Sequence, residues 1–280
     1  MVGYGSSSIA IGMNARLFAV NWRPVRQEIV FARQIGCDYL QVHGSEQGAD
    51  HAYFGDELSA VAAALTEQGI RSVMEIVARL RANGRTAKGS LPLDILRNNL
   101  AAIQALAIEH VHFHFAPAEP MEEVELCVLE ESLIEQLAAG VELAQANGFR
   151  LGLEHNEPDV PLFAAIQPIQ AALNAVPGLG FVWDVNHTRP AELNDWLSLM
   201  PRMTLLHISD TPLPEVNHHL PLGLGNIDFA ARFACLFQGG YTGAAILEIG
   251  GVPKSGGFGR DTDEALADSA GRLKAILCIT

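Results

Sequence analysis

Four side chains in the second half of the sequence could hold a metal ion: Glu154, Asp184, His207 and Glu248. Each lies near the end of a short apolar run, where a buried carboxylate is costly unless a cation or hydrogen-bond donors compensate it. Glu154 or Glu248 alone is explained equally well by a cap or a salt bridge. Together, three carboxylates and one imidazole would carry excess negative charge, which Mg²⁺, Mn²⁺, Co²⁺ or Zn²⁺ accepts. The sequence therefore predicts one divalent metal ion, provided that the four side chains meet.

The elements that must position these residues follow from an alternation of short apolar runs with longer stretches of helical periodicity, which predicts βα units. The expected strands are residues 9–13, 39–43, 71–78, 110–115, 149–154, 179–185, 203–208 and 244–249. The expected helices are residues 25–35, 56–68, 93–107, 122–146, 161–175, 191–199, 227–238 and 262–276.

Eight such units in 280 residues, with no Pro/Ser-rich linker, favour an α/β protein with a single (β/α)8 barrel domain, a TIM barrel, over residues 9–280. Residues 1–8 are expected to form a flexible N-terminal tail. An open sheet that binds a dinucleotide would need Gly-x-Gly-x-x-Gly after its first strand. Residues 13–16 read Met-Asn-Ala-Arg instead, so that alternative has little support.

Polar residues at the C-terminal ends of barrel strands point into a shared active-site mouth. His43 and His114 also occupy such ends, and His219 follows the seventh expected strand. These three histidines are weaker candidates for substrate contact, because each alone is more often a satisfied or exposed side chain. Of His112 and His114 we expect one ring to point into the barrel and the other outward, with His114 nearer the mouth.

The combination of strand-end residues resembles the xylose isomerase-like barrel superfamily, a group of sugar isomerases and ketose 3-epimerases that also includes endonuclease IV. The ligands and signature of that superfamily match Glu154 on the fifth strand, Asp184-x-x-His187 after the sixth, His207 on the seventh and Glu248 on the eighth. His219 with residues 222–229, Leu-Gly-Leu-Gly-Asn-Ile-Asp-Phe, resembles its His…Gly-x-Gly-x-Ile segment. The likeness spans most of the chain.

The resemblance implies a divalent-metal-dependent isomerase or epimerase that acts on a small sugar or ketose, or on a related polyol or keto acid. In such enzymes the metal polarises the substrate carbonyl and stabilises an enediolate, so that a carboxylate can remove a proton. Glu154 and Glu248 would be the acid/base pair, facing each other across the substrate. Asp184 and His207 would mainly hold the ion, and His187 would hydrogen-bond a substrate oxygen.

Three alternatives remain beside this interpretation. A metal-dependent dehydratase of the inosose or dehydroshikimate type shares the first proton transfer, so the sequence cannot separate it from an isomerase. Endonuclease IV places three metals in this mouth, but the third expected strand offers no histidine, and residues 217–219 read Asn-His-His where that enzyme has Asp-x-His. A non-catalytic ligand-binding barrel would not need two glutamates.

Composition limits the partners. The chain has 18 Lys+Arg against 32 Asp+Glu, a net charge of -14, which repels nucleic acid. No signal peptide or apolar run long enough for a membrane is evident. The four cysteines lack a Cys-x-x-Cys pair and are expected to be free, buried thiols in the cytoplasm. A small sugar-like molecule is the expected partner, and a homo-oligomer is compatible with the sequence.

Other side chains are weaker candidates for the binding of a sugar. Trp22 and Trp183 could offer an apolar floor for a sugar ring, although core packing is the default for a strand tryptophan. The basic residues within 79–88 and the loop 254–260 could receive a phosphate or carboxylate. A solvated loop is the more ordinary interpretation of both segments.

Overall fold

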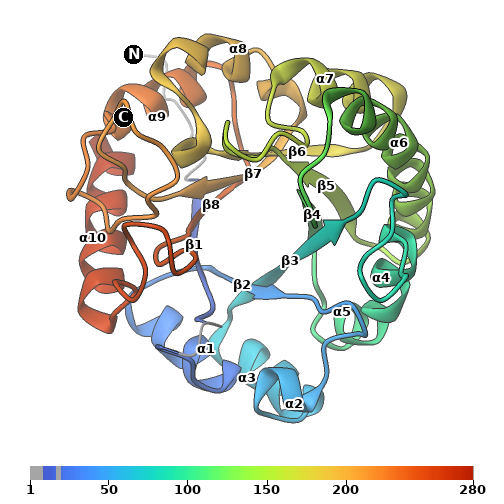
Figure 1. Cartoon of the computed structure of the whole chain (residues 1–280). Helices are drawn as coiled ribbons and strands as arrows, with labels where there is room; N and C mark the ends of the chain where they lie inside the picture. The colour runs from blue at the N-terminus through green and yellow to red at the C-terminus, as the bar shows by residue number, and fades with distance from the viewer. Residues whose placement is uncertain (1–8, 17–19, 280) are drawn as a thin grey trace.

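Eight parallel strands close into a barrel in the computed structural model of the chain, which describes residues 9–16 and 20–279 (Figure 1). Each strand pairs with the next, and the last pairs with the first, so the predicted (β/α)8 barrel is confirmed. The strands are β1 (Ala10–Asn14), β2 (Tyr39–His43), β3 (Arg71–Leu80), β4 (His110–Pro117), β5 (Arg150–Glu154), β6 (Gly180–Asp184), β7 (Met203–Ile208) and β8 (Ala244–Leu247). The predicted tail, residues 1–8, lies outside the described residues.

Helices form a ring around the barrel (Figure 1). The α-helices are α1 (Val25–Gln34), α2 (His51–Phe54), α3 (Leu58–Gln68), α4 (Pro92–Asn98), α5 (Leu100–Ala105), α6 (Glu123–Ala146), α7 (Ile166–Ala175), α8 (Leu193–Leu197), α9 (Phe229–Gln238) and α10 (Asp263–Ile279). Short 3-10 turns are η1 (Val185–His187), η2 (Pro190–Glu192) and η3 (Met200–Arg202). Within the described ranges, no helix has the length and hydropathy needed to cross a membrane.

The helix expected over residues 93–107 is interrupted at Asn99, a fully buried residue between α4 and α5. The amide nitrogen of Asn99 donates to the carbonyls of Ser45 at 2.7 Å and Ile95 at 2.8 Å. Its amide oxygen accepts from the N–H groups of Ser45 at 3.1 Å and Ala49 at 3.0 Å. The break therefore ties the outer helices to the loop after β2.

The helix α7 begins at Ile166, later than the expected residue 161. The residues before it bond to the loop after β5 instead of forming a first helical turn. The backbone N–H of Asn156 donates to the carbonyl of Phe163 at 3.2 Å, and the amide of Asn156 also bonds to the carbonyl of Leu162. These bonds hold Asn156 at the C-terminal end of the barrel.

The two ends of the barrel interior differ, and we call the C-terminal strand ends the mouth and the N-terminal ends the floor. The floor is filled by a small apolar cluster of Tyr39, Val73, Val182, Leu205, Ala244 and Ile246. At the mouth, the strand register pairs Asp184 with His207 and His43 with Glu75. A larger apolar core packs the strands against the helices.

The four cysteines are free, as expected, but only one of them is buried. Cys37 is fully buried, and burial raises the pKa of its thiol to about 12. Cys127, Cys235 and Cys278 are exposed. The expectation of buried thiols is therefore wrong for these three, which lie on outward positions of helices that sequence periodicity did not resolve.

Candidate metal centre

The four predicted ligands meet at the mouth of the barrel. Glu154 ends β5, Asp184 ends β6, His207 lies in β7, and Glu248 directly follows β8. One ligand atom from each lies within 4.8 Å of those of the other three. The Nδ1 atom of His207 is 2.9 Å from Oε1 of Glu154 and 2.9 Å from Oε2 of Glu248. Strand ends that are distant in the chain therefore form one cluster.

Two carboxylates of this cluster have oxygen atoms without the hydrogen bonds that buried charge requires. Oε2 of Glu154 and Oδ2 of Asp184 are buried and find no hydrogen-bond partner among residues 9–16 and 20–279. Burial raises the pKa of Glu154, and it raises the pKa of Asp184 to about 6. Burial acts on Glu248 in the same direction, but the charge and hydrogen bond of His207 outweigh it and lower its pKa to about 2. Buried carboxylate oxygens that lack hydrogen bonds and lie beside imidazole rings fit a divalent cation.

Gln41, in β2, orients the ring of His207. The Nε2 atom of His207 donates to Oε1 of Gln41 at 3.0 Å, while Nε2 of Gln41 donates to Oε2 of Glu75 at 3.4 Å. Because an amide oxygen only accepts, Nε2 carries a hydrogen and Nδ1 faces the carboxylates of Glu154 and Glu248. Burial disfavours the charged ring, but those two carboxylates outweigh burial and raise the pKa of His207. A proton on Nδ1 and a metal ion would compete for one position.

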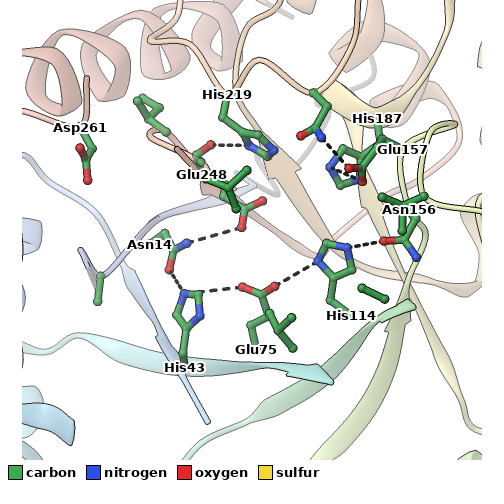
Figure 2. A pocket seen from close by; sticks show the side chains of 18 of the residues that line it. Asn14, His43, Glu75, His114, Asn156, Glu157, His187, His219, Glu248 and Asp261 are labelled. Carbon is green, nitrogen blue, oxygen red and sulfur yellow. Dashed lines mark hydrogen bonds and ion pairs between the residues drawn. The ribbon is translucent and has the colours of Figure 1, made fainter. Parts of the chain in front are cut away.

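A pocket of about 210 Å³ opens above the cluster (Figure 2). Glu248 lines this pocket with 14% of its side chain exposed, whereas the side chains of the other three predicted ligands are 0% exposed beneath it. The pocket is also lined by His43, Glu75, His114, Glu157, His187 and His219. A molecule in the pocket would therefore contact Glu248 directly, among side chains that can bind hydroxyl groups.

The predicted substrate-binding residues His187 and His219 both line the pocket (Figure 2). His187 lies in η1, where its Nδ1 donates to the carbonyl of His155 at 3.0 Å and its Nε2 is 3.2 Å from Oδ2 of Asp184. His219 donates from Nδ1 to the carbonyl of Glu248 at 3.1 Å. Both rings are thus held beside the cluster, and their contact with a substrate stays a prediction.

The loop that carries His219, between β7 and α9, is held by Asp210. The carboxylate of Asp210 accepts hydrogen bonds from the N–H of Gly223 at 2.8 Å and of Ile227 at 3.2 Å. The backbone of Asp210 also pairs with that of Leu220 in an antiparallel bridge. The loop is therefore fixed on both sides of the turn.

His112 and His114 both face the barrel interior, so the expectation that they point opposite ways is wrong. Alternate residues of a strand share one face. His114 lines the pocket, with Nδ1 3.3 Å from Oε1 of Glu75 and 3.6 Å from Oε2 of Glu154. His112 is fully buried below it, with Nε2 3.5 Å from the same Glu154 oxygen. Sequence reasoning therefore placed His114 correctly and missed His112.

The remaining candidates divide between the pocket and other parts of the molecule. His43 lines the pocket and its Nε2 is 2.8 Å from Oδ1 of Asn14. Arg79 also lines it. Trp183 is fully buried and donates to Thr188, and Trp22 is 43% exposed. Neither tryptophan is among the described residues that line this pocket, so neither provides an apolar surface for a sugar ring there.

Besides His112, sequence reasoning missed four other residues near the site: Gln41, Glu75, Asn156 and Glu157. Gln41 and Glu75 are polar residues inside apolar strands, and Gln41 shares a face with His43 because it precedes that residue by two. This alternation was a usable signal. Asn156 contacts Nε2 of His114 at 2.6 Å. Asn156 and Glu157 lie in the loop after β5, where no periodic pattern marks the residues that turn inward.

Solved structures of similar fold include the D-allulose 3-epimerase from Methylomonas sp. in complex with D-allulose, which is 17% identical over 96% of this chain and 97% of that one, with a TM-score of 0.73. Another is 3-keto-D-glucoside 4-epimerase, YcjR, from E. coli, at 16% identity over 95% and 99% of the two chains and a TM-score of 0.72. A third is an AP endonuclease, family 2, from Brucella melitensis, at 16% identity, 94% and 98% coverage and a TM-score of 0.67. At these identities the likeness concerns the fold. No curated protein matches the sequence.

The family assignment rests on a match to the chain itself. The sequence model of the xylose isomerase-like TIM barrel family matches residues 29–276. This range includes every strand from β2 to β8 and all four residues of the metal cluster. The chain belongs to the xylose isomerase-like TIM barrel family.

Proposed function

We propose that the protein is a divalent-metal-dependent isomerase or epimerase that transfers a proton on a small sugar or ketose, or on a related polyol or keto acid. The observation that carries the proposal is the convergence of Glu154 and Glu248 on Nδ1 of His207 below a polar pocket. Two carboxylates at one point supply the base and the acid that such a reaction needs. A barrel that only bound a ligand would not require this pair.

The ion would be held by Glu154, Asp184, His207 and Glu248. Two of these carboxylates have a buried oxygen that lacks a hydrogen bond among the described residues, which supports this assignment. When bound, a divalent cation would polarise the substrate carbonyl and make the neighbouring C–H group more acidic. Gln41 would keep Nδ1 of His207 turned toward the carboxylates of Glu154 and Glu248, as the outer partners of metal-binding histidines do.

Glu248 and Glu154 would carry out the two halves of the proton transfer. Glu248 lines the pocket, so it is placed to remove the proton from the carbon beside the carbonyl. In an epimerisation, Glu154 would deliver a proton to the opposite face of that carbon, and the reverse reaction would exchange the two roles. His187 and His219 would hydrogen-bond substrate oxygens from their positions at the pocket wall.

The similar structures support a sugar substrate. Two of them are epimerases of sugars by name, a D-allulose 3-epimerase and a 3-keto-D-glucoside 4-epimerase, and the first is described in complex with D-allulose. Both cover nearly the whole of this chain. Since the identities are only 17% and 16%, the support extends to the class of reaction and not to one sugar.

A dehydratase of the inosose or dehydroshikimate type is a second candidate, favoured by the position of His114. Burial disfavours the charged form of this ring, but Glu154 and Glu75 outweigh it and raise its pKa to about 10. A protonated imidazole at the pocket wall could give its proton to a departing hydroxyl group after Glu248 has removed the carbon-bound proton. The product, unsaturated in this case, separates the two candidates.

An endonuclease is opposed by charge rather than by a shortage of ligands. The sequence suggested too few ligands for three ions, but the structure brings together three further groups that overlap the main cluster. They are Asp184 with His187 and His219, Glu75 with His114 and Glu154, and His112 with Glu154 and His207. The argument from ligand number is therefore weakened. The net charge of -14 still opposes binding to DNA.

The test combines metal analysis with a panel of substrates. The purified protein is stripped with a chelator, reloaded with Mn²⁺, Mg²⁺, Co²⁺ or Zn²⁺, and incubated in D₂O with ketohexoses, ketopentoses, inososes and abasic DNA. We expect one ion per chain and metal-dependent deuterium incorporation beside the ketone, with a new epimer or aldose as product. An unsaturated product supports the dehydratase, and cleaved DNA with three ions per chain supports the endonuclease. Equal activity after complete metal removal contradicts the proposal.

A further inference from the structure

His112, in the middle of β4, is a buried histidine to which the proposed reaction gives no role. It is fully buried inside the barrel, between His110 at the floor and His114 at the pocket. Neither of its ring nitrogens has a hydrogen bond among residues 9–16 and 20–279. Because a buried polar group without a hydrogen bond costs stability, the filling of space alone explains this ring poorly.

One atom of the metal cluster lies close to this ring. Oε2 of Glu154 is 3.5 Å from Nε2 of His112, and it too is buried without a hydrogen bond among the described residues. Burial and the charge of His207 lower the pKa of His112, so the neutral ring has one N–H donor. A carboxylate oxygen accepts, which favours the hydrogen on Nε2. A donor and an acceptor therefore lie slightly farther apart than a usual hydrogen bond of about 2.7–3.2 Å.

The other imidazole near this oxygen has partners of its own. Nδ1 of His114 is 3.6 Å from Oε2 of Glu154 but 3.3 Å from Oε1 of Glu75, to which it donates. Nε2 of His114 is 2.6 Å from Oδ1 of Asn156. Both nitrogens of His114 are thus engaged elsewhere, whereas those of His112 are not.

The two oxygens of Glu154 have different neighbours. Oε1 is 2.9 Å from Nδ1 of His207, the nitrogen that would bind the ion, whereas Oε2 is the oxygen beside His112. Carboxylates that bind metal ions usually accept a hydrogen bond from an outer residue, which fixes their orientation. His112 is placed to be that residue for Glu154.

We propose that His112 is a positioning residue of the metal centre, whose Nε2–H donates a hydrogen bond to Oε2 of Glu154 when Oε1 binds the ion. The proposal rests on the proposed function, which places an ion at Glu154. His112 lies below the pocket and acts through this carboxylate, without touching the substrate or the ion. Its loss would let the carboxylate turn, and would weaken metal binding rather than the fold.

The test replaces His112 by Leu, which removes the donor, and by Gln, whose amide nitrogen can donate from a position near that of Nε2. Competition with a fluorescent chelator gives the affinity of each protein for Mn²⁺. We expect His112→Leu to weaken Mn²⁺ binding about 10–100-fold, the usual cost of losing an outer partner, and His112→Gln to stay within about threefold of the wild type.

Thermal unfolding of the metal-free proteins separates positioning from packing. His112→Leu replaces a polar ring that lacks hydrogen bonds by an apolar side chain, so its unfolding temperature should equal or exceed that of the wild type. If it is lower, His112→Met takes its place in the same measurements. A lower temperature in both variants overturns the proposal, because His112 would then serve the packing of the core.

Two control variants lie at the floor. His110→Leu makes the same change two residues earlier on the same face of β4. Glu109→Gln changes a carboxylate that has 42% of its side chain exposed. We expect wild-type affinity for Mn²⁺ from both.

Each contrary outcome has its own meaning. Equal affinity of His112→Leu and the wild type overturns the proposal, as does an equal loss in His112→Leu and His112→Gln. Electron spin echo spectroscopy of the Cu²⁺-loaded proteins counts the imidazoles bound to the ion, and we expect the same count in the wild type and His112→Leu. One imidazole fewer in the variant also overturns the proposal, because His112 would then be a ligand itself. A wild type that binds no divalent ion overturns the proposed function, and the role of His112 with it.

Discussion

The mouth and the floor of this barrel are built by the same eight strands but have opposite chemistry. At the mouth, three carboxylates and an imidazole converge, and two carboxylate oxygens lack hydrogen bonds in the part of the chain that the structure describes. At the floor, six mainly apolar residues pack together. Unpaired buried charge costs stability, whereas apolar packing supplies it. Apolar packing at the floor therefore offsets part of the loss in stability that buried charge causes at the mouth.

The strand β4 carries one histidine at the floor and another at the mouth, on the same face, and their pKa values shift in opposite directions. At the floor, Nε2 of His110 forms a hydrogen bond of 2.9 Å with Oγ1 of Thr204, and burial lowers the pKa of His110 to about 3. Gly152 on the next strand leaves room for this ring, since a Cβ there would lie 2.8 Å from it. His114, at the mouth, has a pKa raised to about 10, because Glu154 and Glu75 outweigh burial. Residue type alone therefore does not set the charge of a histidine in this barrel.

The largest expected effect concerns the mouth. Glu248→Gln and Glu154→Gln should each lower kcat by about a thousandfold or more, as the loss of an acid or base does, measured by deuterium exchange. Their unfolding temperatures should stay near that of the wild type, because the amide removes charge and retains volume. Glu109→Gln is the matched control at the other end. Full activity in both variants would end the assignment of the acid/base pair.

The second effect concerns the floor. Leu205→Ala removes a buried side chain of the floor cluster and should lower the free energy of unfolding by about 2–5 kcal/mol, measured in urea. Metal affinity, measured by calorimetry at a temperature where the variant is folded, should change less than about twofold, because Leu205 is not part of the metal cluster. A tenfold loss of affinity would show that the two ends are not independent.

The third effect lies between the two ends. Gln41→Leu removes the acceptor that orients His207 and should weaken metal binding by about 10–100-fold, the usual cost of losing such a partner. Metal competition with a fluorescent chelator measures this. Gln104→Leu, at an exposed position of α5, is the control. If both variants bind metal alike, Gln41 does not orient the ligand.

The fourth effect is a pH dependence of stability that comes from His110 at the floor. Its folded pKa of about 3 lies below the usual value of 6.5, so the unfolded chain binds a proton that the folded chain does not. Above about pH 6.5 neither state holds this proton, and the titration of His110 does not affect the free energy of unfolding. As the pH falls from 6.5 toward 3, the free energy of unfolding decreases by about 1.4 kcal/mol per pH unit. Between pH 4 and 6, stability of the metal-free wild type should fall more steeply than that of His110→Gln. Parallel curves would contradict the assigned pKa.

The sequence predicted the barrel because each βα unit has its own local signals. Strand β2 was predicted with its observed bounds, residues 39–43, and α3 ends at Gln68 as expected. The break at Asn99 was not predictable, since its partners Ser45 and Ala49 belong to another unit. Local periodicity carries no information about such contacts.

The candidate site divides in the same way. Glu154 and Asp184 were predicted because a strand end in a barrel points to the mouth. Gln41 and Glu75 were missed because their importance depends on which interior faces meet across several strands. The expectation that His112 and His114 point opposite ways was wrong for a local reason, because residues two apart on a strand share a face.

The anchoring of the loop after β7 by Asp210 has a consequence for ligand affinity. Ordering a flexible segment on binding costs conformational entropy, which is subtracted from the free energy of association. Because Gly223 and Ile227 are already tied to Asp210, His219 is presented in a preorganised position. If His219 contacts a substrate as proposed, less of their attraction would be spent on ordering the loop, and more would remain as affinity.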